Sequence, residues 1–183
     1  CMKTYKLNDL NNPLISVLMP AYNAEKYIKE AIESILNQTF SNFEFIIIDD
    51  GSIDATEEII KSFKDSRIVY IKNEKNLGLI KTLNKGISIA RGEFIARMDS
   101  DDISMPQRFE LQLDVFKKYK GVDIVNVALK KMSEDGTKLS KYRHNIYPGF
   151  EAIHYLINID TFIVHPGVLV KACLLKKYRY RDC

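Results

Sequence analysis

The stretch ISVLMPAYNAEKYIKEAIESIL, residues 15–36, joins a short apolar run to a helical pattern. Ile15 to Met19 contains β-branched residues and stops at Pro20, which predicts a buried strand that ends in a loop. Asn23 is a good helix N-cap, and Glu25 places negative charge in the turn that follows. Apolar residues then recur at helical spacing, namely Ile28, Ala31, Ile32, Ile35 and Leu36. The stretch therefore predicts one strand–loop–helix unit.

Three further apolar runs continue this alternation of strand and helix. The predicted strands cover residues 45–48, 68–71 and 94–98, and amphipathic helical patterns follow the first two of them. Asp54 and Glu57 have the spacing of a capping box, which predicts the start of the helix after the second strand. Apolar strands that alternate with amphipathic helices are typical of a mostly parallel sheet with helices on both faces. We therefore expect a doubly wound α/β fold.

Beyond Asp102 the alternation becomes less regular. Ser104 and Gln107 predict a capped helix with Pro106 in its first turn, and its apolar positions are Phe109, Leu113 and Phe116. Strands are predicted over residues 123–128 and 138–143, with a hairpin turn at Glu134-Asp135-Gly136 before the second of them. A short helix over 150–157 and a strand over 161–164 are expected before His165-Pro166-Gly167.

The composition excludes several classes of protein. The 183 residues, of which 46% are hydrophobic and 28% charged, suffice for one domain with a buried core. There is no uncharged apolar run of about 18 residues, and residues 1–12 lack the apolar segment of a signal peptide. The three cysteines, Cys1, Cys173 and Cys183, have neither disulfide-framework nor zinc-site spacing. A net charge of +3 suits a small anionic ligand or an acidic membrane surface and is too weak to indicate nucleic acid. We therefore expect a soluble cytoplasmic protein.

Polar side chains gather where the predicted strands end. Ala21-Tyr22-Asn23 follows the first strand, Asp49-Asp50 the second, and Asp99-Ser100-Asp101-Asp102 the fourth. In a sheet with the strand order 3-2-1-4, these three ends are neighbours at the edge where such sheets bind ligands. Clustered carboxylates repel one another, so they persist best where a cation compensates their charge. The sequence therefore favours a ligand-binding crevice that also holds a metal ion.

Asp99 and Asp101 are the candidate metal ligands. Their carboxylates point to the same side if the backbone stays extended, and carboxylate oxygens suit Mg²⁺ or Mn²⁺. Each motif also has a simpler interpretation. The acidic residues can be solvated turns, Asp49 and Asp50 can form an Asx turn, and the Tyr22 ring can pack on its helix.

Four blocks of the sequence resemble, in order, the signature blocks of family 2 glycosyltransferases. They are PLISVLMPAYNAEKYIKEAIESILNQTF (13–40), FEFIIIDDGSIDAT (43–56), NLGLIKTLNKGI (76–87) and GEFIARMDSDDISMPQR (92–108). A looser resemblance continues through His165-Pro166-Gly167 and Lys171. The resemblance implies the GT-A fold, a Rossmann-like, doubly wound, mostly parallel mixed sheet flanked by helices.

The resemblance also implies which residues bind the donor. The loop that holds the nucleoside would contain Pro20, Ala21, Tyr22, Asn23 and Glu25, and Asp50 would hydrogen-bond a uracil-like base. Asp101 would reach the metal, Mn²⁺ or Mg²⁺, while Asp99 and Ser100 would make ribose and metal-shell contacts, so that the metal ligands are Asp101 and Asp99. Gly78 and Lys81 match a loop near the sugar diphosphate.

The activity that the resemblance implies is sugar transfer from a nucleotide diphosphate donor, a UDP-sugar, to an acceptor hydroxyl with inversion. The acceptor would be a glycan or a lipid-linked glycan, in polysaccharide or glycolipid synthesis at the inner face of a bacterial membrane. The family's catalytic Asp matches a position after Cys183, so we expect a truncated sequence that binds donor but transfers little sugar. The expected parts are an N-terminal extension (1–12), a nucleotide-sugar-binding half (13–105) and the start of an acceptor-side half (106–183).

Two other functions are open on the sequence alone. Asp99-x-Asp101-x-Ile103 approximates the nucleophile motif of Mg²⁺-dependent phosphatases related to haloacid dehalogenases, although that motif normally follows the first strand of its fold. A nucleotide-sugar-binding module without turnover is the second alternative. His165 is more often structural in this context, and Arg97 has two interpretations, a phosphate contact or a salt bridge with the acidic cluster. His144 and His154 are not assigned a role.

Overall fold

A six-stranded mixed sheet forms the centre of the computed structural model, which describes residues 12–128, 130–133, 139–141 and 165–181. The strand order is β3-β2-β1-β4-β8-β5. The strands are β1 (Ile15–Ala21), β2 (Phe43–Asp49), β3 (Ile68–Lys72), β4 (Phe94–Arg97), β5 (Ile124–Val125) and β8 (Leu169–Lys171). The predicted order 3-2-1-4 is therefore confirmed for the first four strands.

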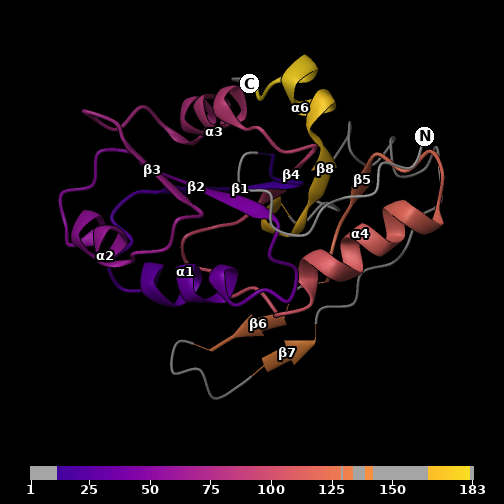
Figure 1. Ribbon diagram of the computed structural model, residues 1–183. Coiled ribbons are helices and arrows are strands. Elements are labelled where there is room, and N and C mark those ends of the chain that lie inside the picture. Colours follow the sequence, from indigo (N-terminus) through magenta and orange to yellow (C-terminus); the bar gives the residue numbers. More distant parts are fainter. Residues whose placement is uncertain (1–11, 129, 134–138, 142–164, 182–183) are drawn as a thin grey trace.

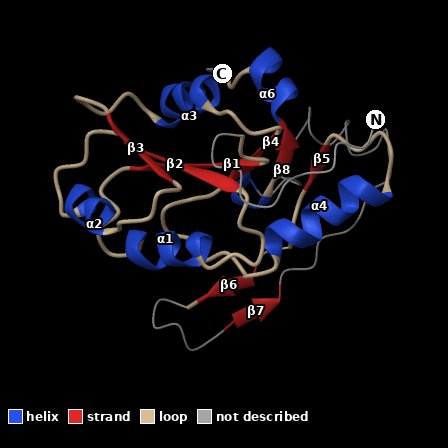
Figure 2. Ribbon diagram, viewed as in Figure 1, coloured by secondary structure: helices blue, strands red, loops and turns tan. Residues whose placement is uncertain are grey.

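Helices cover both faces of this sheet (Figures 1 and 2). On one face lie α1 (Ile28–Leu36), α2 (Thr56–Ser62) and α4 (Arg108–Lys118), and on the other lie α3 (Leu79–Ile89) and α6 (Ala172–Tyr178). Each face has its own apolar core: Ile32 and Phe109 belong to the first, Leu83 and Ala172 to the second. Within the described residues, no helix has the length and apolar character needed to cross a membrane.

The four central strands are parallel, and β8 runs antiparallel to both β4 and β5. Every residue of β1, β2 and β4 is buried. Strands covered on both faces need apolar side chains on both sides, which explains the continuous apolar runs in the sequence. The predicted mostly parallel, doubly wound sheet with an antiparallel component is confirmed.

A buried polar cluster fixes the start of β4 against β1. Ser16 Oγ donates a hydrogen bond to Glu44 Oε1 (2.6 Å) and accepts one from Gly92 N (2.8 Å). Glu44 Oε1 also accepts from Arg91 N (2.7 Å), and Glu44 Oε2 accepts from Arg91 Nε (2.8 Å). Each buried polar atom of this cluster has a hydrogen-bond partner. The cluster therefore fixes the position of β4 without leaving the Glu44 carboxylate unpaired.

Two predicted helix starts are wrong, and the start predicted from Asp54 is nearly correct. Helix α1 begins at Ile28, five residues after Asn23. Helix α2 begins at Thr56 with no side-chain cap from Ala55, and Asp54 Oδ1 accepts from Thr56 N (3.0 Å). Asp54 and Glu57 form no capping box, because Glu57 pairs with lysines instead. Helix α4 begins at Arg108, also without a side-chain cap. The residues that suggested caps bond to neighbouring loops: Ser104 Oγ, for example, accepts from Gln38 Nε2 (3.2 Å).

The chain after α4 differs from the prediction in detail. Strand β5 covers only Ile124–Val125 of the predicted 123–128 and pairs with β8. A hairpin is formed by β6 (Lys130–Met132) and β7 (Leu139–Lys141), and β6 was not predicted. The turn at 134–136, the helix over 150–157, the strand over 161–164, residues 1–11, His144 and His154 lie outside the described residues.

Gly92 offers a test of this packing. A Cβ at this position would lie 2.5 Å from Ser16 N and 2.8 Å from Ile15 C, both backbone atoms of a buried strand that cannot move away. We expect Gly92→Ala to lower the free energy of unfolding by about 3 kcal/mol, as overpacking of a rigid core does. Urea denaturation measures this change.

Gly121→Ala is the matched control. Gly121 has a φ of 86°, but a Cβ there would meet nothing within 4 Å. That variant should lose only the backbone cost of a left-handed alanine, about 1 kcal/mol. An unfolding free energy for Gly92→Ala equal to that of Gly121→Ala would contradict the packing described here.

Candidate functional site

An open pocket of about 280 Å³ lies at the carboxyl ends of the central strands, beside the start of α3. Side chains and backbone from three strand ends and from α3 line it: Pro20, Ala21, Tyr22, Asp50, Asn76, Gly78, Leu79, Thr82, Asp99 and Ser100. Six of the predicted nucleotide-binding residues are in this lining, and Asn23, Glu25 and Lys81 are not. The assignment of all nine to a nucleotide remains a prediction.

Asp50 anchors one wall of the pocket. Its carboxylate is 4% exposed and accepts hydrogen bonds from Asn73 Nδ2 (2.7 Å), Leu77 N (3.0 Å) and Gly78 N (2.9 Å). These three donors hold the loop between β3 and α3 against the end of β2. A carboxylate offers about four acceptor positions, so one position remains for a ligand in the pocket.

Asn73 and Lys85 extend this anchor, and the sequence reasoning missed both. Asn73 Nδ2 also contacts Thr82 Oγ1 (3.2 Å), and Asn73 Oδ1 accepts from Lys85 Nζ (2.5 Å). Asn73 follows β3 directly, so the rule that singled out polar residues at the other strand ends would have found it. Lys85 carried no such signal, because it lies in the middle of α3.

The loops after β1 and β2 are hydrogen-bonded to each other. Asn23 has a φ of 47°, and its Oδ1 accepts from Ile53 N (3.0 Å). Glu25 Oε2 accepts from Ala55 N (3.0 Å), while Glu25 N donates to Asp54 Oδ2 (3.1 Å). Asn23 and Glu25 therefore hold in place the loop after β1 that contains Tyr22, which we call the Tyr22 loop. Tyr22 itself is 48% exposed and lines the pocket.

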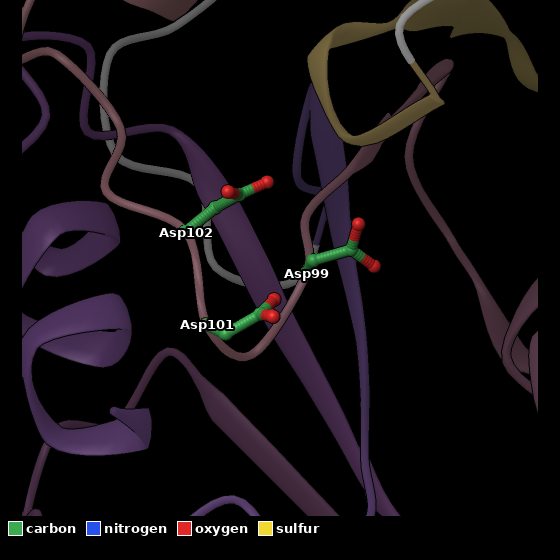
Figure 3. A group of neighbouring side chains, drawn as sticks. All are labelled: Asp99, Asp101 and Asp102. Carbon is green, nitrogen blue, oxygen red and sulfur yellow. The ribbon is translucent and has the colours of Figure 1, made fainter. Parts of the chain in front are cut away.

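Asp99, Asp101 and Asp102 form an acidic group at the end of β4 (Figure 3). Each offers a carboxylate oxygen, and these oxygens lie within 4.8 Å of one another. The backbone is not extended, as the sequence reasoning assumed, but forms a turn in which Asp102 N donates to Asp99 O (3.5 Å). Because the chain turns here, the Asp102 carboxylate lies with those of Asp99 and Asp101. In an extended chain it would point to the opposite side, and it was not predicted as a ligand.

Two buried arginines support this acidic turn. Arg97 is 2% exposed and forms an ion pair with Asp99, so the salt-bridge interpretation of Arg97 is the one found in the structure. Arg108 donates to Arg97 O (2.8 Å) and Val168 O (3.2 Å). Burial lowers the pKa of Arg108 to about 10, which leaves it charged at neutral pH. The turn is therefore tied to α4 and to β8.

The acidic turn carries more negative charge than its arginines compensate. Burial, reinforced by the nearby Asp99 and Asp101 carboxylates, raises the pKa of Asp102 to about 6. A divalent cation would relieve this repulsion, and three carboxylates on one turn match the oxygen ligands of Mg²⁺ and Mn²⁺. The donor set thus fits a hard metal ion.

His165 has a structural partner. Its Nε2 lies 2.7 Å from Tyr180 Oη, and the Tyr180 backbone pairs with the Asn84 side chain on α3. Burial, together with the nearby Arg97 charge, lowers the pKa of His165, which favours the neutral ring. These contacts agree with the structural role that the sequence favoured. Lys81 lies exposed on the first turn of α3.

The fold and the site define a class of protein. The fold is that of the GT-A glycosyltransferases, and it is similar to that of S. aureus TarS in complex with UDP-GlcNAc. The TM-score is 0.71 at 25% sequence identity, over 89% of this chain and 46% of TarS. The model of Glycosyl transferase family 2 matches residues 16–179, and the chain belongs to this family. Family membership decides against the phosphatase alternative.

Curated relatives agree with this assignment. The uncharacterized glycosyltransferase MJ1057 of Methanocaldococcus jannaschii is 40% identical over 180 residues, which are 96% of this chain and 62% of that protein. The Escherichia coli UDP-Glc:alpha-D-GlcNAc-diphosphoundecaprenol beta-1,3-glucosyltransferase WfgD is 37% identical over 123 residues, 64% of this chain and 49% of WfgD. The chain therefore spans about half of the length of WfgD and 62% of that of MJ1057.

The role of Asp50 as an anchor can be tested by hydrogen exchange. Asp50→Asn keeps the size of the side chain but replaces one accepting oxygen by an NH₂ group, which faces Leu77 N if it replaces Oδ1 and Gly78 N if it replaces Oδ2. We expect faster exchange of at least one of these two amides and a loss of about 1–3 kcal/mol in stability, because a buried donor is left without its acceptor. Asp54→Asn, which alters the other loop contact, should leave both amides unchanged. Unaltered protection of Leu77 and Gly78 in Asp50→Asn would contradict the anchor.

Proposed function

We propose that the strand-end pocket binds the nucleotide of a UDP-sugar and that the protein transfers the sugar to an acceptor hydroxyl with inversion. The observation that carries this proposal is the joint presence, around one pocket, of the Tyr22 loop, the Asp50 anchor and the acidic turn. TarS supports the choice of donor, since it has been crystallised with UDP and with UDP-GlcNAc.

The nucleoside would lie between the Tyr22 loop and Asp50. The exposed Tyr22 ring offers an aromatic surface beside the pocket, and Pro20 and Ala21 complete that wall. The remaining acceptor position of Asp50 suits an N–H donor on the edge of a uracil base. Asn23 and Glu25 would act through the loop that they hold.

The diphosphate would lie at the beginning of α3. Gly78 and Leu79 line the pocket there, and the first turn of α3 contains no acidic residue. Backbone N–H groups at a helix N-terminus bind phosphate oxygens well. Lys81, on the same turn, would add a positive charge near the diphosphate.

The metal would be held by Asp101 and Asp99, as the sequence predicted, with Asp102 as a third ligand. Asp99 is already paired with Arg97, and the charges of Arg97 and Arg108 also act on Asp102, so the three carboxylates exceed the two arginines by one negative charge that a cation would meet. A bound Mn²⁺ or Mg²⁺ would stabilise the negative charge that develops on the diphosphate leaving group. Ser100 would contact the ribose or the metal shell.

The remaining assignments extend this proposal to the whole protein. Residues 13–105 would be the donor-binding half and residues 106–183 the beginning of the acceptor-side half. No residue of this sequence is assigned as the general base that takes the acceptor proton. WfgD supports a lipid-linked acceptor by its name, and synthesis of bacterial surface polysaccharide or glycolipid at the inner membrane face is the proposed setting.

Calorimetry of UDP binding tests the donor and metal assignments together. We expect UDP to bind in Mn²⁺ and to bind at least about tenfold more weakly in EDTA. Asp101→Asn should lose most of the Mn²⁺ effect, because removal of metal-site groups typically costs about 10–100-fold in metal affinity. Asp114→Asn, an exposed carboxylate on α4, is the control and should behave as the unmodified protein does. Equal UDP affinity in Mn²⁺ and EDTA would rule out the metal site.

A further inference from the structure

Helices α3 and α6 lie side by side on one face of the sheet (Figure 1). Each of them carries two lysines and no acidic residue, and the exposed Glu93 lies beside the start of α6. Residues 79–91 and 168–181, which contain the two helices, have eight Lys or Arg and no Asp or Glu. The whole chain has a net charge of only +3, so the rest of it is net acidic. The positive charge is therefore concentrated in this pair of segments, which we call the α3–α6 face.

Several of these basic groups have neutral partners. Lys176 Nζ donates to Ala90 O (2.9 Å), and Arg179 Nη1 donates to Asn84 O (2.9 Å). Carbonyl oxygens fix these side chains without cancelling their charge. Two members of the face do pair with carboxylates, Arg91 with Glu44 and Lys171 with Asp123. The others leave a positive potential that an anionic surface would meet.

The two helices form a continuous surface. Lys176 reaches the C-terminal end of α3, whereas the Tyr180 backbone bonds to Asn84 in its middle, so α6 runs back along α3. Their apolar positions pack inward on the sheet with the second core. Lys177, Arg179 and Arg181 are exposed on the outer side.

Apolar side chains accompany the charges. The Tyr178 ring is 55% exposed and lies next to Lys177, and Ile89 at the end of α3 is 38% exposed. Tyrosine at a lipid–water boundary buries its ring while its hydroxyl stays wet, and lysine can extend its charge to the headgroups. This mixture of charged and apolar side chains suits a lipid surface better than nucleic acid. Nucleic acid phosphates would contact the basic groups but would leave the apolar side chains exposed to water.

We propose that the α3–α6 face binds membranes that contain anionic lipids. Clusters of Lys and Arg bind such surfaces through summed electrostatic attraction, which salt weakens. Leu79, at the start of α3, lines the pocket, so a membrane-bound face would hold the pocket beside the lipid surface. The face shares Leu79, Thr82 and Lys81 with the proposed donor site, whereas Lys176 and Lys177 on α6 lie outside the pocket lining, so their replacement leaves that site intact.

Vesicle co-sedimentation of the 183-residue chain tests the proposal. The probes are vesicles of phosphatidylcholine alone and of an equal mixture of phosphatidylcholine and phosphatidylglycerol. We expect binding to the mixed vesicles, weak binding to phosphatidylcholine, and release at high salt. Lys176→Gln with Lys177→Gln should weaken the binding at least about tenfold, since two charges leave the surface.

The matched control is Lys117→Gln with Lys118→Gln. Those lysines occupy the last turn of α4 as Lys176 and Lys177 occupy that of α6, but α4 lies on the opposite face of the sheet. This control should bind vesicles as the unmodified chain does, and thermal unfolding should show that both variants are folded. Equal losses in the two variants, or equal binding to both kinds of vesicle, would overturn the proposal. The proposal would also be overturned if the chain bound duplex DNA but not the mixed vesicles, and if only the Lys176→Gln, Lys177→Gln variant lost that DNA binding.

Discussion

The parallel pairing of β1 with both β2 and β4 is the constraint on which the site depends. It places Ala21 opposite Asp49 and Leu18 opposite Arg97. The pairing continues past the strands, because Asp50 N donates to Ala21 O (2.8 Å) and Met98 N donates to Leu18 O (3.1 Å). The sheet hydrogen bonds thus hold the backbone of the Tyr22 loop, the Asp50 anchor and the start of the acidic turn at one edge. Loops alone would have to pay the entropy of assembling these groups.

Charge balance is the second condition of the site. The acidic turn follows a buried arginine, and a second buried arginine joins that strand to α4 and β8. Removing either arginine would leave buried carbonyl or carboxylate groups without donors, which is costly in a dry interior. The arginines compensate part of the negative charge and fix the turn, while burial, together with the nearby Asp99 and Asp101 carboxylates, raises the pKa of Asp102.

Much of the fold could be predicted because it depends on patterns that are local in the sequence. Continuous apolar runs marked the four central strands, and the polar residues after β1, β2 and β4 marked the pocket. The cap predicted at Asn23 failed because its side chain bonds to another loop, thirty residues away, and such a contact leaves no local pattern. Asp102 was missed as a ligand because the acidic segment was taken as extended, whereas it turns. Lys85 was missed because a lysine inside a helix is usually solvated.

The central claim is that these strand ends form one donor site in which nucleotide and metal lie together. A crystal structure of the chain grown with UDP and Mn²⁺ tests it most directly, since anomalous scattering locates the Mn²⁺ ion. We predict the uracil beside Tyr22 and Asp50, with the ion between the diphosphate and the carboxylates of Asp101 and Asp102. Nucleotide in another part of the molecule, or an ion away from the acidic turn, would contradict the account.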